Sequence, residues 1–457
     1  MRRTVKLRMI KIGSTAALLV GFLLLHPWSV ADLAAMPLIQ RITLPNKLVL
    51  LLAEEHSLPF VTIQMIIEAG SRLDPAGKEG LANLTARGLM LGTSKWSAVD
   101  LNETLDFMGA AMGVSASKDN ASISLRVLKK DLEKGFGLFL DALTASTFPE
   151  EELKKEVKKI LGAIQSVEEQ PMEVAEQAFY TALFPDGPYG HPVEGSKGSV
   201  ATLSSREVAR FYKTHYHPNN AVLAVVGDIT LEEVKTRLVP LLLNWPIGET
   251  AKPTFNPAFA KGPETMRINR DIAQANIIIG GIGIERANPD FYALTVMNYI
   301  LGGGGFGSRL MDEIRVKRGL AYSVSSFFDA KKYSGSFQVV LQTKNVSAKE
   351  AISLALKQIE MIRQEPVSEE ALRRAQNYLV GSFPLRFDTQ GKLAGFLTQI
   401  EYYGLGLDYA EKYPALIKSI SREDVLRVAR KYLQPDPALR VVVGNLKEAG
   451  LETPGNK

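Results

Sequence analysis

Two kinds of hydrophobic pattern alternate along the chain. Longer stretches repeat apolar residues with the helical period, and two of them begin with a capping box, at Ser204–Glu207 and at Ser347–Glu350. Between them lie short runs rich in Val and Ile, which predict β-strands. The clearest of these runs cover residues 48–52, 61–67, 122–127 and 277–284. The sequence therefore predicts a mixture of strands and long helices, of the α/β or α+β class.

The N-terminus has a different pattern. Residues 1–31 hold five basic residues and no acidic one, and the basic residues precede an uncharged, mostly apolar run from Ile12 to Ala31. This order is typical of a secretory signal, and Ser29-Val30-Ala31 offers a small-x-small cleavage site. The apolar core is short for a membrane span and is interrupted at His26-Pro27. The pattern predicts export, to the periplasm or outside the cell, with a retained N-terminal membrane anchor as the alternative.

The charge of the remaining chain argues against a partner that is a nucleic acid. The sequence of 457 residues has 54 Lys and Arg against 49 Asp and Glu, a net charge of +5. Without the five basic residues of the N-terminal segment, 54 − 5 = 49 basic groups face 49 acidic ones. A neutral body has no electrostatic attraction for a polyanion. The chain also has no cysteine, so disulfides are excluded, and its length allows several domains.

The chain repeats itself at an offset of 217 residues. Residues 203–228 align with 420–445, and each copy has a serine before a helix, then a proline, then a β run that ends in glycine. Eight positions are identical, and the proline and the glycine are nine residues apart in both copies. An offset of 219 also aligns Glu150-Glu151 with Glu369-Glu370, each before a basic helix. The sequence therefore predicts a duplicated unit of about 200 residues.

Two stretches resemble a known family. Residues 69–93, which include Gly80-Leu81-Ala82-Asn83, resemble the segment that carries the inverted zinc motif in the pitrilysin/insulinase metallopeptidases. Residues 301–323 resemble the glycine-rich turn and the Arg/Tyr motif in the second half of the same family. With the duplication, the resemblance covers about Gln40 to Leu446. It implies an α+β fold of two duplicated halves, each with an antiparallel-rich sheet and helices packed on one face.

The zinc motif itself is missing. Active members of the family carry His-x-x-Glu-His on one helix, where two imidazoles hold zinc and the Glu is the general base. The corresponding positions here are Asn83, Ala86 and Arg87, and the third ligand position, about 76 residues later, is Ala163. An amide is a poor zinc ligand, alanine offers no base, and a guanidinium repels the cation. The resemblance therefore implies that this chain binds no metal and no other cofactor.

The other histidines do not replace these ligands. None of them has the spacing that places two ligands on one helix face, and His215 and His217 are two residues apart at a predicted helix end. The set consists of His56, His191, His215 and His217. We expect them to have structural or surface roles.

The Arg/Tyr motif, in contrast, is intact. Arg318 and Tyr322 are four residues apart, after a periodic helix and before a strand-like run. In the family these residues contact the substrate backbone and help to stabilise the developing oxyanion, which a guanidinium and a phenol can do as donors. Out of this context, such a pair is more often a surface charge and a packed aromatic ring. The resemblance implies a substrate-contact role for Arg318 and Tyr322.

Four consecutive glycines precede this motif: Gly302, Gly303, Gly304 and Gly305. A P-loop would need a Gly-Lys-Ser/Thr ending, and a Rossmann fold would need a strand where residues 290–300 predict a helix. The resemblance implies a flexible substrate loop, and a purely structural tight turn is the alternative. Residues 113–117 and 322–328 are candidate sheet edges that could bind an extended peptide by strand addition.

These features together give an expected organisation and function. A signal segment at 1–31 precedes a half with the degenerate zinc motif, 38–250, a linker at 251–264, and a half with the Arg/Tyr motif, 265–450. The resemblance implies an exported, non-catalytic subunit that supplies the Arg/Tyr half-site to a zinc-bearing partner with His-x-x-Glu-His, as in heterodimeric peptidases. Peptides are the expected substrates. The alternative is a peptide-binding or assembly scaffold with no proteolytic role.

Overall fold

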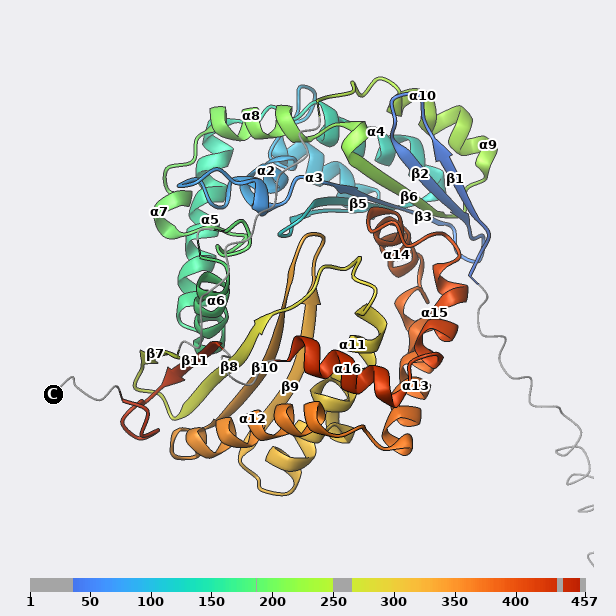
Figure 1. The fold of residues 1–457 in the computed structure, drawn as a ribbon. Helices are drawn as coiled ribbons and strands as arrows, with labels where there is room; N and C mark the ends of the chain where they lie inside the picture. Colours follow the sequence, from blue (N-terminus) through green and yellow to red (C-terminus); the bar gives the residue numbers. More distant parts are fainter. Residues whose placement is uncertain (1–35, 186, 250–264, 434–438, 453–457) are drawn as a thin grey trace, which may run out of the picture. The chain divides into compact units, whose positions relative to one another are not determined.

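Two mixed sheets and the helices around them make up the chain (Figure 1). The structure is a computed structural model that describes residues 36–185, 187–249, 265–433 and 439–452. The expected signal segment, residues 1–31, and the expected linker, residues 251–264, lie outside the described residues. Within the described ranges, no helix is long and apolar enough to cross a bilayer.

The first sheet has the strand order β1-β2-β6-β3-β5-β4. β2 and β6 run parallel, and the other neighbouring strands run antiparallel. Side chains of β3 alternate between the two faces, so that Ile63 and Met65 lie together in the core of this half. The strands are β1 Ile39–Thr43, β2 Val49–Glu54, β3 Phe60–Ile67, β4 Ala111–Ala116, β5 Ala121–Leu128 and β6 Ala221–Gly227.

The second sheet repeats this topology with one strand fewer. Its order is β7-β11-β8-β10-β9, and only β7 and β11 run parallel. In each half, the last strand inserts between a parallel neighbour and an antiparallel one, which is what the duplication in the sequence predicts. The strands are β7 Thr265–Asn269, β8 Gln274–Ile282, β9 Ala321–Ala330, β10 Gly335–Lys344 and β11 Leu439–Gly444.

The helices follow the same repeat. α5 and α13 begin at Glu150 and Glu369, the aligned acidic pairs. The helices of the first half are α2 Leu81–Gly88, α3 Ala98–Phe107, α4 Leu132–Thr144, α5 Glu150–Glu168, α6 Pro171–Leu183, α7 Lys197–Val200, α8 Ser205–His215, α9 Leu231–Glu233 and α10 Val239–Leu242. Those of the second half are α11 Phe291–Asn298, α12 Ala348–Gln364, α13 Glu369–Ser382, α14 Gln390–Tyr402, α15 Tyr409–Lys418 and α16 Arg422–Tyr432.

Capping explains where the repeated helices begin. The predicted capping box of Ser204 and Glu207 is present at α8, and Ser421 forms an equivalent box at α16. The predicted capping box at Ser347 is wrong. Ser347 ends a 3₁₀ turn and already has a helical backbone, with φ −96° and ψ −4°, so its side chain does not cap α12. Glu350, the predicted partner of Ser347 in this capping box, instead lies 3.5 Å from Arg318.

One helix of each half packs against the sheet of the other half. α14 packs against β6 and β3 of the first sheet, and α6 packs against β11 and β8 of the second (Figure 1). Phe179 of α6, for example, lies in one apolar cluster with Val441 of β11. Helices on one face of each sheet were expected. In addition, a single helix from the other half covers the opposite face of each sheet. The two halves are interlocked through this exchange.

A polar contact joins the two halves at their edge hairpins. Lys332 lies in the turn between β9 and β10. Its backbone N–H donates to Asp119 of the β4–β5 turn at 3.0 Å. Nζ of Lys332 lies 2.6 Å from Glu68, and the hydroxyl of Tyr333 donates to the same carboxylate at 2.6 Å. Asp119 is buried, so this link lies between the halves and not on an open surface.

Candidate functional site

The positions of the family's zinc ligands lie on α2 and α5. α2 starts after Gly80, whose φ of +96° favours glycine, and Asp74 accepts hydrogen bonds from the backbone N–H groups of Gly80 and Ala82 at 2.8 and 2.7 Å. Asn83 and Ala86 are buried, and Arg87 is the one residue of α2 that is partly exposed. Asp74 therefore holds the start of α2 in place.

Arg87 forms an ion pair in the place of a metal ligand. Its Nε donates to Oε1 of Glu156 on α5 at 2.6 Å, and its Nη2 lies 2.5 Å from the same oxygen. Glu156 is only 5% exposed and also accepts from Lys159 at 3.0 Å. Burial acts to raise the pKa of Glu156, but the hydrogen bonds from Lys159 and Arg87 outweigh it and lower the pKa. The remaining ligand position, Ala163, is exposed on α5.

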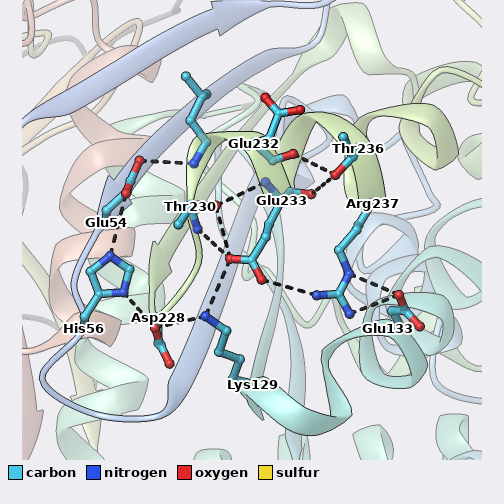
Figure 2. A network of polar contacts seen from close by, with 11 residues as sticks. Glu54, His56, Lys129, Glu133, Asp228, Thr230, Glu232, Glu233, Thr236 and Arg237 are labelled. Carbon is cyan, nitrogen blue, oxygen red and sulfur yellow. Dashed lines mark hydrogen bonds and ion pairs between the residues drawn. The ribbon is translucent and has the colours of Figure 1, made fainter.

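A second cluster of charged side chains surrounds His56 (Figure 2). Its Nδ1 lies 2.7 Å from Oδ1 of Asp228, and its Nε2 lies 3.6 Å from Oε2 of Glu54. Lys129 also contacts Asp228, at 3.2 Å. The hydrogen bond with Asp228 raises the pKa of His56, which favours an imidazolium without a lone pair for a metal. This cluster links the ends of β2 and β6.

The other histidines are engaged or buried. Burial lowers the pKa of His215 to about 4, and Nε2 of His217 lies 2.9 Å from the carbonyl oxygen of Lys213. Burial likewise lowers the pKa of His191, whose Nδ1 lies 2.9 Å from the carbonyl oxygen of Pro192. In the part of the chain that the structure describes, no group of three or more His, Asp or Glu side chains has the arrangement of a metal site.

The glycine-rich turn begins inside one π-helical segment and ends before a second one. Tyr299–Gly303 (η5) continues α11, and Met311–Val316 (η7) follows the 3₁₀ turn Gly305–Gly307 (η6). π-Helical turns are rare in proteins overall, but those that occur are frequently found at functional sites. Two glycines are required by the backbone. A Cβ on Gly302 would lie 2.5 Å from Oγ of Ser326 in β9, and Gly305 has a φ of +56°.

Tyr322 is exposed on the edge strand β9. Its side chain is 74% exposed, and the guanidinium of Arg315 lies 5.4 Å from the centre of its ring. The same guanidinium lies 5.0 Å from the ring of Phe306, which is 69% exposed. Arg315 is therefore held between two exposed aromatic rings by cation–π contacts. Within the described residues it has no carboxylate partner.

Arg318, the arginine singled out in the sequence, has a different environment. Its Nε donates to Oε1 of Glu313 at 3.1 Å, and its Nη1 lies 3.5 Å from Glu350. The structure thus places Arg315 against Tyr322, whereas Arg318 is engaged by two carboxylates. Sequence reasoning missed Arg315 because a spacing of seven residues indicates no contact unless the turn at Gly319, with a φ of +62°, is known.

Both predicted sheet edges are edge strands. β4 ends the first sheet and β9 ends the second, as expected from residues 113–117 and 322–328. Neither strand contains Lys, Arg or Pro, the residues that commonly block an edge, whereas β1 and β7 at the opposite edges each contain an arginine. β4 and β9 therefore leave backbone groups available for an added strand.

This architecture defines a class of protein: two interlocked α+β halves, with an ion pair between Arg87 of α2 and Glu156 of α5. Comparison with known proteins identifies the family. Residues 49–197 match the family described as Insulinase (Peptidase family M16), and residues 202–379 match the Peptidase M16 inactive domain. The chain belongs to the M16 peptidase family, and its second half matches the domain of that family described as inactive.

Individual relatives agree with this assignment. An uncharacterized zinc protease of Streptomyces coelicolor is 29% identical over 418 residues, which cover 90% of each chain. A Helicobacter pylori protein named a non-peptidase homolog is 26% identical over 400 residues, with 86% of this chain and 91% of the relative covered. The crystal structure of a peptidase M16 inactive domain from Pseudomonas fluorescens has a TM-score of 0.83 and 27% identity, and covers 89% of this chain and 98% of that chain.

Proposed function

We propose that this chain is an exported, non-catalytic subunit of a two-chain zinc peptidase. In this proposal a separate M16 polypeptide with His-x-x-Glu-His holds the zinc, and this chain supplies the residues that hold the peptide. One observation carries the proposal: Arg87, at a position predicted for a zinc ligand, pairs with Glu156, while Tyr322 is exposed beside Arg315, which pairs with no carboxylate among the described residues. A half-site for substrate is retained although the half-site for metal is lost.

Tyr322 and its neighbouring arginines would hold the peptide through donated hydrogen bonds. A phenol and a guanidinium donate at neutral pH without changing protonation state, so both can bind a carbonyl oxygen and the charge that develops on it. Arg315 is free to do so, because among the described residues its guanidinium contacts the rings of Phe306 and Tyr322 and no carboxylate. Arg318 would first have to leave Glu313.

The edge strand that carries Tyr322 gives the peptide a place to bind. An extended peptide that pairs with β9 is recognised through backbone hydrogen bonds, and this mode tolerates many side chains. The glycines at 302–305 would keep the turn beside β9 narrow enough for this approach. We therefore propose peptides or unfolded segments as substrates.

The N-terminal segment supports a location outside the cytoplasm. Residues 1–31 have the basic and apolar regions of an export signal. We propose that the subunit acts after export, in the periplasm or outside the cell, and that its partner carries an export signal too.

Reconstitution of activity tests the proposal. The purified chain alone should bind no zinc and cleave no peptide, and mixing it with the zinc-bearing subunit should give peptidase activity. Tyr322→Phe removes only the hydroxyl and should lower kcat/KM by roughly one to three orders of magnitude, the range for an oxyanion donor. Arg315→Ala and Arg318→Ala tell which arginine acts, and Arg206→Ala, an exposed arginine on α8, is the matched control.

Two results would overturn the proposal. The first is stoichiometric zinc together with peptide hydrolysis in the isolated chain. The second is a mixture whose activity is the same with Tyr322→Phe as with the wild type. The second result would favour the alternative, a peptide-binding or assembly scaffold, which the name of the Helicobacter pylori relative, a non-peptidase homolog, also fits.

A further inference from the structure

A pocket of about 260 Å³ lies between the π-helical segment η7 and helix α12. Its lining includes the charged residues Arg309, Asp312 and Lys317 and the uncharged residues Gln358 and Met361. None of these residues takes part in the zinc position or in the contact between Arg315 and Tyr322. The pocket adjoins the half-site described above, because Glu313, which also lines the pocket, pairs with Arg318.

Most of the charges in the lining are already neutralised. Nζ of Lys317 lies 2.7 Å from Oδ2 of Asp312 and 3.4 Å from Oε2 of Glu313. Glu313 in addition pairs with Arg318 at 3.1 Å. These ion pairs leave two charges of the lining to be explained, Arg309 and Glu365.

Arg309 and Glu365 have no ion pair with each other or with another described residue. Arg309 is half-buried, and its burial lowers its pKa, which Glu365 opposes by its charge. Removing a guanidinium from water without giving it an acceptor costs free energy, so such groups are normally paired. Arg309 and Glu365 therefore offer a ligand in this pocket one cationic and one anionic group.

The two uncharged residues of the lining offer further contacts. Gln358 is only 7% exposed, and its Nε2 has no better acceptor among the described residues than Sδ of Met361 at 3.8 Å. Its amide is therefore available to a polar ligand. Met361 is partly exposed and provides an apolar, adaptable surface for a short side chain.

We propose that this pocket binds a small zwitterion, an α-amino acid or the unblocked ends of a very short peptide. Its carboxylate contacts Arg309, its ammonium group contacts Glu365, and its side chain lies on Met361. The free amino acid and the very short peptide offer the same two groups, a carboxylate and an ammonium group a few bonds apart. The inference does not rest on the proposed function, because the pocket is complete within this chain.

Isothermal titration of the exported chain with L-leucine tests the inference. Leucine, or the dipeptide leucyl-leucine, should bind at one site per chain, and the comparison tells a free amino acid from a short peptide. N-acetyl-L-leucine lacks the ammonium group and L-leucinamide lacks the carboxylate. Each should bind about 10- to 100-fold more weakly, the usual effect of losing a charge-assisted hydrogen bond.

Variants connect the binding to the pocket. Arg309→Gln should weaken leucine binding at least tenfold, and Arg309→Lys should retain part of it because the charge remains. Glu365→Gln changes an exposed side chain and should abolish the preference for leucine over N-acetyl-leucine. Arg373→Gln, an exposed arginine on α13, is the matched control and should bind as the wild type does.

Three results would overturn the inference. They are the absence of saturable binding by both leucine and leucyl-leucine, equal binding of leucine and its two blocked forms, and unchanged binding in a folded Glu365→Gln or Arg309→Gln variant.

Discussion

Arg87→Ala removes the side chain that occupies the former metal position, and the structure sets the size of its effect. Arg87 contributes the contacts at 2.6 and 2.5 Å to Glu156, a carboxylate that is 5% exposed. Losing a hydrogen bond to a buried charged group costs about 1.5–3 kcal/mol. Lys159 still contacts Glu156 in the variant, and the side chain of Arg87 is 42% exposed, so we expect a loss of about 1–2 kcal/mol in the free energy of unfolding.

The same interaction predicts a dependence on pH. The pKa of Glu156 is lowered in the folded chain, because the hydrogen bonds from Lys159 and Arg87 outweigh the effect of burial. A carboxylate with a lowered pKa stabilises the fold above its unfolded pKa of about 4.3, and this contribution is lost as the pH falls through the folded value. The difference between wild type and Arg87→Ala should therefore be full at neutral pH and should shrink in acid.

Equilibrium urea unfolding, followed by circular dichroism at neutral and acid pH, measures both effects. Arg206→Ala is the control and should change the free energy of unfolding by less than about 0.5 kcal/mol. If Arg87→Ala unfolds at the same urea concentration as the wild type at neutral pH, the ion pair does not stabilise the fold. A loss of stability that is equal at both pH values would show that packing, and not the charge of Glu156, is responsible.

Three further predictions concern the zinc position, the glycine turn and the link between the halves. A variant with the three ligand positions and the general base restored should bind one Zn²⁺ per chain by equilibrium dialysis, whereas the wild type should bind none. It carries Asn83→His, Ala86→Glu, Arg87→His and Ala163→Glu. Gly302→Ala would place a Cβ 2.5 Å from Oγ of Ser326 and should lower the free energy of unfolding, measured by thermal denaturation, by about 1–3 kcal/mol. Gly381→Ala is the control and should not lower it, because a Cβ on Gly381 would have no atom within 4 Å. Lys332→Met removes the contact of 2.6 Å with Glu68 and should speed hydrogen exchange in the β9–β10 turn, and unchanged exchange would show that this contact does not hold the turn.

Local patterns predicted most of the fold. Apolar runs identified strands because β-branched residues and alternation are properties of a few neighbouring positions, and the four predicted runs correspond to β2, β3, β5 and β8. The offset of 217 residues predicted the repeated sheet topology, because the matched serines cap the equivalent helices α8 and α16 and the matched glycines end the equivalent strands β6 and β11. The exchange of α6 and α14 was not predictable, since an amphipathic helix does not specify which sheet it covers.

The candidate site was predictable only in part. The residues at the zinc positions follow from the resemblance, but the run at 150–159 has the charge pattern of a solvated helix face and gives no sign that Glu156 is buried. Its partner, Arg87, is 69 residues away in the sequence, and only the packing of α2 on α5 brings the two together. Arg315 was missed for a similar reason, because the turn after η7 decides which side chain faces Tyr322.

The exchange of helices has a consequence for biosynthesis. α14 covers the face of the first sheet to which Ala224 and Val226 belong, and it comes from residues 390–402. A ribosome that has finished the first half has therefore made a sheet with one bare apolar face, and roughly 160 further residues must follow before its cover is synthesised. The nascent chain should engage holdase chaperones during this interval. Removing either half would therefore uncover an apolar sheet face of the other half.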